Sequence, residues 1–390
     1  MAATEAHGLF DLDNHFYETE DAWTRYLAPE YRALLGQFHL TGGGGGGRDE
    51  RPAGQENWVV KPGSLKELLR RMKSDVPDDY YPLMPPLAAF SDRDERIKLM
   101  DEQGIEACLM FSSAVSTEIL YFRDKDPRAL HAHFHALNRW IEDEWGYAYQ
   151  NRVFCPAMIT LRDLDLAVAE LERVIDAGAR VVNLRPGHAY GRSPGDPYFD
   201  PFWARVNEAG LSVAFHQGES GWNAAVAGDW GYDPNPTRVL EMSAWQWFNS
   251  YGNTSIMAVL SALLYDNLFA RFPNIKVASI ENGAGWLPYF MAHIDKMRGM
   301  GRNGPWNGGQ LKERPTAIAR RHILIAPYPE DDVEKIVEEV GHEMIGMGSD
   351  YPHAEGMAAP REFGRLVQHL PEDQQRWILH DNGVRMVGLT

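Results

Sequence analysis

Eight short apolar runs, separated by stretches of helical pattern, constrain the fold of this 390-residue chain more than any other feature. The runs are rich in Val, Ile, Leu, Ala and Phe, which is typical of strands buried on both faces of a parallel sheet. Eight strand–helix units favour a closed (β/α)8 barrel over an open, doubly wound sheet. We therefore predict an α/β fold of the TIM-barrel type, with strands starting near Phe10 and then at 105–113, 152–160, 180–186, 211–218, 275–282, 322–328 and 344–350.

The composition narrows the choice of partners. The net charge is −17, whereas binding to nucleic-acid phosphates requires clustered Lys and Arg. No apolar run approaches the roughly 20 residues of a membrane span, and the N-terminus lacks the pattern of a secretion signal. Cys108 and Cys155 lie in apolar runs and are expected to be reduced core residues. We expect a cytoplasmic protein with a small-molecule substrate and without nucleic-acid or membrane partners.

An irregular region, roughly 19–90, follows the first strand and contains a run of glycines from Gly42 to Gly47. These glycines have no side chains with which to pack, and ordering them costs much conformational entropy. We predict that 19–90 is an insertion that forms a cap or mobile lid over the barrel mouth. Residues 1–390 are expected to form a single barrel domain that includes this insertion.

Polar side chains stand at the carboxyl ends of several predicted strands. In a barrel these ends meet at one face, which carries the active site. A lone histidine at a strand end is more often a hydrogen-bonded structural residue than a ligand. Imidazole and carboxylate groups gathered from separate strands, however, suit one divalent cation, with Zn²⁺ favoured and Mn²⁺ or Fe²⁺ as alternatives. The residues at these positions are Asp13, His15, Arg185, His188, His216, Glu281 and Asp350.

The sequence resembles the amidohydrolase-related family of metal-dependent barrels, in the branch that includes aminocarboxymuconate-semialdehyde decarboxylase. The resemblance rests on a D-x-D-x-H start followed by the segments ARVVNLRP, AFHQG, FPNIKVASIENGAGWLPYF, GSDYPHAEG and HDNGVRMVGL. It implies that the cation is bound by Asp13, His15, His216 and Asp350. It also implies a homodimer or a higher homo-oligomer.

Two positions depart from the family pattern. Asp13 stands where the family has the first histidine of an H-x-H pair, which makes the site more anionic and moves its preference towards Mn²⁺ or Fe²⁺. Glu281 and Asn282 stand where the decarboxylases have a histidine that acts as acid/base or ligand. The decarboxylation mechanism of the family therefore does not carry over unchanged.

We predict a metal-dependent hydrolase that uses a cation-activated water on a small, cyclic or aromatic carboxylated substrate. Asp350 would accept the proton of the water, and Glu281 or His188 would assist the leaving group. Arg185 and His353 are predicted to bind the substrate, although an ion pair inside the barrel mouth is an equal alternative for Arg185. Non-oxidative decarboxylation of an aromatic or unsaturated acid is the alternative reaction. A catalytically inactive barrel used for binding is the second alternative.

Overall fold

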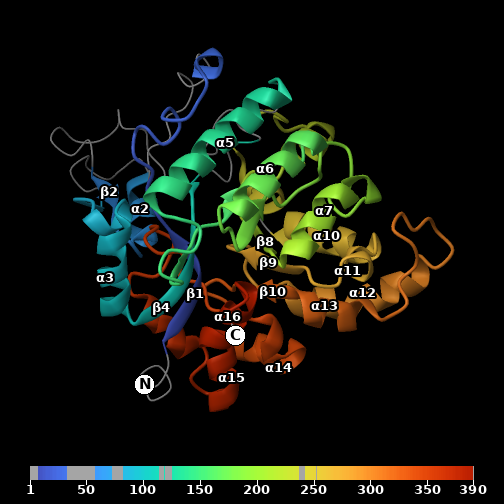
Figure 1. Cartoon of the computed structure of the whole chain (residues 1–390). Helices are drawn as coiled ribbons and strands as arrows, with labels where there is room; N and C mark the ends of the chain where they lie inside the picture. The colour runs from blue at the N-terminus through green and yellow to red at the C-terminus, as the bar shows by residue number, and fades with distance from the viewer. Residues whose placement is uncertain are drawn as a thin grey trace.

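The computed structural model describes residues 8–32, 58–72, 82–113, 118, 125–236, 242–251 and 253–389, and Figure 1 shows their arrangement. The glycine run 42–47 and much of the predicted cap lie outside these residues. Among the described helices, none is long and apolar enough to cross a membrane.

Parallel strands form the centre of the molecule, in two hydrogen-bonded sheets. One sheet has the order β1-β4-β5 and the other β10-β9-β8-β7-β6. β5 and β6 are separated by Cys155 and Pro156, and Pro156 has no backbone N–H to donate to a neighbouring strand. The strands are β1 (Leu9–His15), β4 (Ile105–Phe111), β5 (Val153–Phe154), β6 (Ala157–Met158), β7 (Val181–Leu184), β8 (Ser212–His216), β9 (Lys276–Ile280) and β10 (Ile323–Ile325).

The segment 345–351 connects the free edges of the two sheets. The Gly346 N–H donates to the Ile325 carbonyl on β10 at 3.0 Å, and the Leu12 N–H of β1 donates to the Met347 carbonyl at 2.8 Å. The segment makes only isolated bridges, so it is not a full strand of either sheet. The predicted α/β fold is confirmed, and this segment occupies the place of the predicted strand 344–350.

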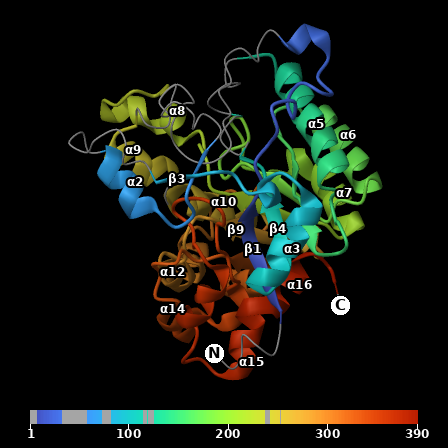
Figure 2. The same ribbon diagram turned by 90° about the vertical axis from the view of Figure 1, so that its left-hand side faces the viewer.

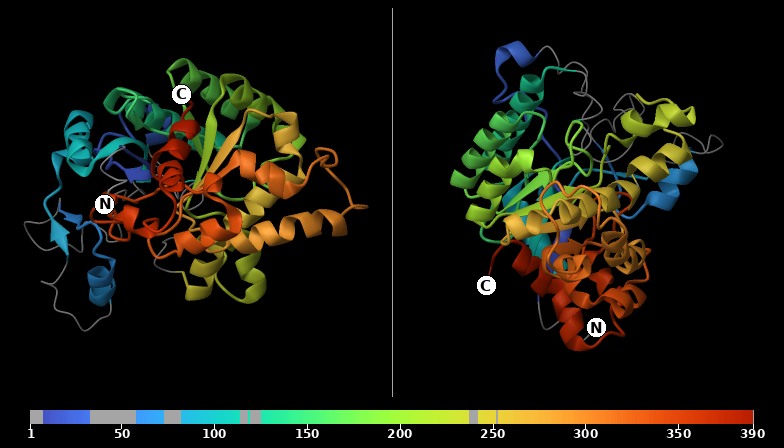
Figure 3. Two further views of the ribbon diagram at one scale, coloured as in Figure 1. Left: turned by 90° about the horizontal axis from the view of Figure 1, so that it is seen from below. Right: turned by 90° about the vertical axis from the view of Figure 1, so that its right-hand side faces the viewer.

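Helices surround the strands, as the views along and across the barrel show (Figures 1 and 3). Helix α3 stops at Gly104 and helix α7 at Gly210, each in the left-handed conformation that glycine adopts without strain. The surrounding helices are α3 (Arg93–Gln103), α5 (Pro127–Glu144), α6 (Leu164–Asp176), α7 (Asp200–Ala209), α10 (Asn253–Tyr265), α11 (Leu268–Arg271), α12 (Leu287–Met300), α13 (Pro315–His322), α14 (Val333–Val340), α15 (Glu372–Arg376) and α16 (Asn382–Met386).

Residues 19–32 of the predicted insertion contact α5, where Arg25 pairs with Glu144 and the Tyr26 hydroxyl donates to Asp143. The part that includes residues 58–72 and 82–84 lies against the loop that follows the segment 345–351. It contains β2 (Val59–Val60), paired antiparallel with β3 (Leu83–Met84), and the helix α2 (Leu65–Met72). The Gly63 N–H donates to the His353 carbonyl, and the Leu65 N–H donates to the Ala354 carbonyl. Figure 2 shows α2 and β3 on the same side of the molecule as the short helices α8 (Trp222–Val226) and α9 (Ala244–Gln246).

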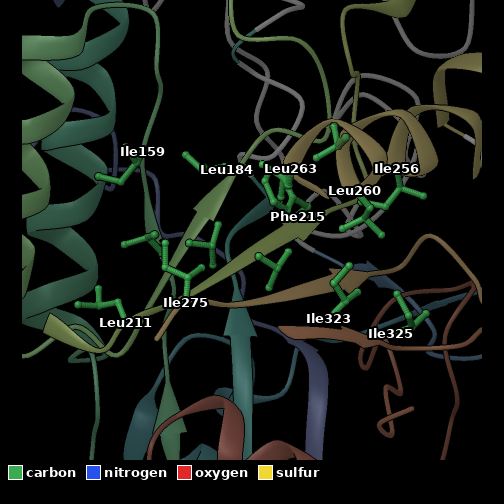
Figure 4. Packing of buried hydrophobic residues seen from close by; sticks show 14 of the residues in the cluster. Ile159, Leu184, Leu211, Phe215, Ile256, Leu260, Leu263, Ile275, Ile323 and Ile325 are labelled. Atoms are coloured by element: carbon green, nitrogen blue, oxygen red, sulfur yellow. The ribbon is translucent and has the colours of Figure 1, made fainter. Parts of the chain in front are cut away.

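Two layers of apolar side chains hold the barrel together. The larger layer packs strands against helices, and Figure 4 shows Leu184 of β7 and Phe215 of β8 in it beside Leu260 of α10. The smaller cluster takes side chains from all the named barrel strands except β6 and fills the barrel interior. Met386 and Val387, at the end of the C-terminal helix, also belong to this cluster. That helix therefore covers the amino-terminal end of the barrel (Figure 3). Cys108 and Cys155 are both free and buried, as predicted.

A bulge in β1 changes which of its side chains face the barrel interior. Phe10 and Leu12 belong to the interior cluster, so strict alternation would turn Asp13 and His15 away from it. Between Asp11 and Asn14 the register shifts: these residues pair with Cys108 and Met110, so one extra residue of β1 is accommodated. His15 then pairs with Phe111, an interior residue of β4. Bulges re-aim side chains in this way, and this one turns the predicted ligands inward.

Close packing at the amino-terminal end of the barrel gives a test of the fold. A Cβ atom at Gly383 in α16 would lie 2.2 Å from Cδ1 of Phe10, whereas a Cβ atom at Gly299 in α12 would meet no atom within 4 Å. Gly383→Ala should therefore lower the free energy of unfolding by about 1–3 kcal/mol. Gly299→Ala should leave it unchanged or raise it by up to about 1 kcal/mol, because alanine favours helix. Chemical denaturation measures both, and equal stability of the two variants would contradict the packing.

Candidate metal centre

The four predicted ligands come together at the carboxyl ends of the strands. His15 Nε2 lies 3.3 Å from Asp13 Oδ1 and 3.2 Å from Asp350 Oδ1. His216 Nε2 lies 3.3 Å from His15 Nε2 and 3.4 Å from Asp13 Oδ1. All four residues are buried. Residues more than 300 positions apart in sequence thus present their donor atoms to one point.

Asp11 fixes the two elements that carry three of these four residues. Its Oδ1 accepts hydrogen bonds from the N–H groups of Asp13 and Ser349, and its Oδ2 accepts from Asn14 Nδ2 and the Ser349 hydroxyl. Asp11 is fully buried, and burial raises its pKa to about 6, although these hydrogen bonds act in the opposite direction. It ties β1 to the segment 345–351 directly beside the ligands.

A buried arginine forms hydrogen bonds that hold the carboxyl end of β1. The guanidinium of Arg96, on α3, donates to the Asn14 side chain and to the His15 carbonyl, and it also donates to the Ala89 carbonyl at 3.1 Å. Arg96 is completely buried. These bonds hold the His15 backbone, so the direction of its imidazole depends on packing that is remote from the strand itself.

Hydrogen bonding sets the tautomer of His216. Its Nδ1 lies 2.9 Å from the Gln217 carbonyl, which can only accept, so Nδ1 carries the proton. Nε2 is then left with a lone pair that faces Asp13 and His15. This is the arrangement that second-shell carbonyls impose on metal-binding histidines.

His353 lies within the cluster, next to Asp350. Its Nδ1 is 2.7 Å from Asp350 Oδ1, and its ring contacts that of His15 in a tilted arrangement, with the ring centroids 3.9 Å apart and the planes at 33°. The Tyr17 ring stacks on the other side, 6.3 Å from His353. The structure therefore brings His353, predicted to bind substrate, to the candidate metal centre.

Glu281 is the third carboxylate of the cluster. Its Oε2 lies 3.4 Å from His216 Nε2, and one carboxylate oxygen of each of Asp13, Glu281 and Asp350 lies within 4.8 Å of the others. Burial and the negative charges of Asp350 and Asp13 raise the pKa of Glu281 well above its usual range. Both Glu281 and Asp350 have positive φ, 56° and 53°, a strained conformation for residues with a side chain that is found most often at functional sites.

The donor set fits a divalent cation. Asp13 Oδ1 is buried and forms no hydrogen bond, which costs free energy unless another positive group satisfies it. Burial would lower the pKa of His15, but its contacts with Asp13 and Asp350 outweigh this effect and raise it to about 9. Burial would raise the pKa of Asp13, but His15 and His216 lower it. Carboxylates and imidazoles around an unsatisfied buried oxygen are ligands for Zn²⁺, Mn²⁺ or Fe²⁺.

The structure does not bring Arg185 and His188 into this cluster. The side chains of Arg185 and Glu118, each 5% exposed, form an ion pair at 3.3 Å. Arg185 also donates to the carbonyls of Ser220 and His188. The ion-pair alternative for Arg185 is thus what the structure shows, and a substrate clamp would require this pair to open. Burial and the charge of Arg185 lower the pKa of His188, which lines a neighbouring cavity of about 490 Å³.

Sequence reasoning assigned no function to three supporting residues of the site. Glu118 also accepts hydrogen bonds from Thr160 and Tyr190, and it lies in a stretch without strand or helix periodicity. In the sequence, nothing distinguishes Arg96 from the other charged residues of the same predicted amphipathic helix. Asp11 alternates with Asp13 and His15, and this spacing is the one signal that could have marked it.

Comparison with known proteins supports the family resemblance. A family model for amidohydrolases matches residues 86–389. This chain belongs to the amidohydrolase family. Among named relatives, the γ-resorcylate decarboxylase of Polaromonas sp. strain JS666 is 27% identical over 272 residues, which is 67% of this chain and 73% of that protein. The γ-resorcylate decarboxylase of Rhizobium radiobacter is 24% identical over 239 residues, covering 60% of this chain and 67% of that protein.

Solved structures support the fold of this amidohydrolase. An amidohydrolase from Mycobacterium avium subsp. paratuberculosis superposes with a TM-score of 0.78 at 27% identity, covering 98% of this chain and all of that one. A dihydroxybenzoic acid decarboxylase from Polaromonas sp. JS666, crystallised with manganese and 2-nitroresorcinol, has a TM-score of 0.61 at 17% identity, covering 98% of this chain and 97% of that one. The predicted barrel class is therefore confirmed. The predicted homodimer, cytoplasmic location and preference for Zn²⁺ stay predictions.

Removing one imidazole tests the metal centre. His216→Ala should weaken divalent-cation binding at least about 10-fold, since changes even to outer-shell partners have effects of that size. Elemental analysis of protein purified without added metal measures it. The control is His322→Ala, because the His322 Nδ1 bonds the Ile275 carbonyl away from the cluster. Unaltered metal content in His216→Ala would refute the ligand assignment.

The buried ion pair gives a separate prediction. Arg185→Met should lower the free energy of unfolding by about 3–5 kcal/mol, because Glu118 keeps a buried charge without its ionic partner. Adding Glu118→Gln should recover part of this loss. Arg205→Met is the control: its pair with Glu172 is about half exposed, at 46% and 51%, so its loss should change the free energy of unfolding far less than Arg185→Met does. Unchanged stability of Arg185→Met would favour the predicted role as a free substrate clamp.

Proposed function

We propose that this amidohydrolase is a metal-dependent decarboxylase of a small aromatic acid. The observation that carries the proposal is the cluster of carboxylates and imidazoles in a chain whose named relatives are γ-resorcylate decarboxylases. The hydrolase reaction predicted from the sequence has less support, because these relatives favour the alternative reaction. It remains the second candidate, since a 27%-identical structure is described as an amidohydrolase.

In this proposal Asp13, His15, His216 and Asp350 hold one divalent cation. When bound, the cation supplies positive charge that orients an acidic substrate and stabilises the electron pair left behind as CO₂ departs. The second carboxylate in place of an imidazole, Asp13, favours Mn²⁺ or Fe²⁺ over the predicted Zn²⁺. The manganese in the Polaromonas dihydroxybenzoic acid decarboxylase is consistent with that preference.

The reaction breaks the bond between the ring carbon and the carboxylate, releases CO₂ and places a proton on that carbon. We assign delivery of the proton to the Asp350–His353 pair, whose Oδ1 and Nδ1 are 2.7 Å apart. A proton shared over this distance can move to the substrate and be replaced from the imidazole.

Aromatic side chains limit the access of water to the cluster. The Phe111 ring lies 4.6 Å from the ring of His216, and Tyr17 covers His353. Both residues are buried. A dry site strengthens every interaction between the ligands and a charged substrate, and it favours loss of CO₂ over attack by water.

A substrate panel distinguishes the two reactions. We expect CO₂ release from γ-resorcylate (2,6-dihydroxybenzoate) by the Mn²⁺-loaded protein, loss of activity with a chelator and recovery with Mn²⁺. Lactones and amides should not be hydrolysed. His353→Gln, which removes the proton but keeps a side chain of similar length, should lower kcat by about 100-fold or more. Incorporation of ¹⁸O from labelled water into products, without CO₂ release, would identify a hydrolase instead.

A further inference from the structure

We propose that Glu281 is a fifth protein ligand of the cation. This inference rests on the cation of the proposed function, but not on the reaction. It assigns to Glu281 a role in binding rather than the proton transfer that the sequence suggested. The site then contains three carboxylates and two imidazoles, and an octahedral cation keeps one open position.

The distances within the cluster match such a shell. Ligand atoms about 2.1 Å from an octahedral cation lie about 3.0 Å apart when adjacent and about 4.2 Å apart when opposite. Glu281 Oε2 is 3.4 Å from His216 Nε2, close to the separations of His15 from Asp13 and Asp350, 3.3 and 3.2 Å. Glu281 therefore stands in the same relation to the cluster as the ligands implied by the family.

The backbone of Glu281 is shaped to turn its carboxylate inward. Ala278 and Ile280 of β9 face the barrel interior, so strict alternation would direct Glu281 away from it. The left-handed conformation at Glu281, φ 56°, breaks this alternation and brings Oε2 to His216. Such a conformation persists only where surrounding contacts maintain it.

Several hydrogen bonds maintain it here. Tyr328 donates its hydroxyl hydrogen to the Glu281 carbonyl at 2.9 Å, and Gln217 Nε2 donates to the Tyr328 oxygen. Asn282 Nδ2 donates to the carbonyls of Phe215 and Ile280. Asp331 accepts from the N–H groups of Ala284 and Tyr328, which holds the loop after Glu281. The strand end is thus preorganised on both sides of Glu281.

The charges around Glu281 also require a cation. Among the described residues, no Lys or Arg forms an ion pair with Asp13, Glu281 or Asp350; their ionic partners are histidines. Asp13 Oδ1 is buried without a hydrogen bond. Three carboxylates in a largely buried site repel one another unless positive charge lies between them. A divalent ion at this point satisfies all three carboxylates, including the Asp13 oxygen that has no hydrogen bond.

The fifth ligand has a consequence for the substrate. Four protein ligands leave two positions on an octahedral cation, and where these are adjacent a substrate can chelate it through a carboxylate and a neighbouring hydroxyl oxygen. Five protein ligands leave room for one oxygen. The substrate class that fits is therefore an acid bound through a single oxygen, for which an ortho hydroxyl group is not required.

Mn²⁺ binding by the full-length protein tests the assignment without depending on activity. Glu281→Gln keeps the size of the side chain but is a poorer ligand, so Mn²⁺ affinity measured by calorimetry should fall at least about 10-fold. Glu281→Asp, which is shorter by one methylene, should give an intermediate loss. In ¹⁷O-labelled water, the electron paramagnetic resonance of bound Mn²⁺ should indicate one coordinated water in the wild type and one more in Glu281→Gln.

Glu355→Gln is the matched control. Glu355 is exposed and close enough to Glu281 to influence it electrostatically, so the change removes the same charge at the barrel mouth without removing a ligand. Its Mn²⁺ affinity should stay within about 2-fold of the wild type, as expected for a screened surface charge. Thermal unfolding of the metal-free variants checks folding, and Glu281→Asp decides the question if Glu281→Gln does not fold.

The outcomes separate this inference from the proposed reaction. Wild-type affinity and an unchanged water number in Glu281→Gln would overturn the fifth ligand while leaving decarboxylation intact. Weakened Mn²⁺ binding in Glu281→Gln, in a protein that releases no CO₂ from any aromatic acid, would support the ligand and refute the reaction. A wild type that binds no Mn²⁺, Fe²⁺ or Zn²⁺ would overturn both.

Discussion

The hydrogen bonds between β1 and the segment 345–351 are the constraint on which the rest of the site depends. They connect the first and last parts of the barrel, and Asp11 lies buried between them with all its bonds directed to these two elements. The same contacts set the positions of Asp13, His15 and Asp350. The hydrogen bonds that join the two sheets along this edge therefore also position three of the candidate ligands, and a substitution that breaks them should affect both.

The concentrated, largely buried charge of the site costs folding free energy. Three carboxylates and two imidazoles share a largely buried volume, and two of the carboxylate residues have positive φ. Folding tolerates this arrangement because β1, β8, β9 and the segment 345–351 are held by apolar packing on both faces of the barrel. A divalent cation bound there would replace this mutual repulsion with ligation, which would make so anionic a cluster compatible with a stable fold.

The sequence predicted the parts of this protein that depend on periodicity and on residue type. The alternation of strands and helices predicted the barrel. Strand-end residues together with the family motifs predicted the four candidate ligands that the structure brings together. Three features escaped because they depend on tertiary context. The β1 bulge is visible only from its pairing with β4, and the left-handed conformation of Glu281 depends on contacts with Tyr328 and Asn282. For Arg185 the sequence allowed an ion pair, but it did not identify the partner Glu118, which is 67 residues away.

The central claim is that the cluster binds one divalent cation. Anomalous diffraction from a crystal grown with Mn²⁺ tests it most directly, because the signal locates the ion without reference to any assumed ligand. We predict one strong peak, about 2.0–2.3 Å from oxygen or nitrogen atoms of Asp13, His15, His216 and Asp350. No peak at the cluster, or a peak only at a surface site, would contradict the account.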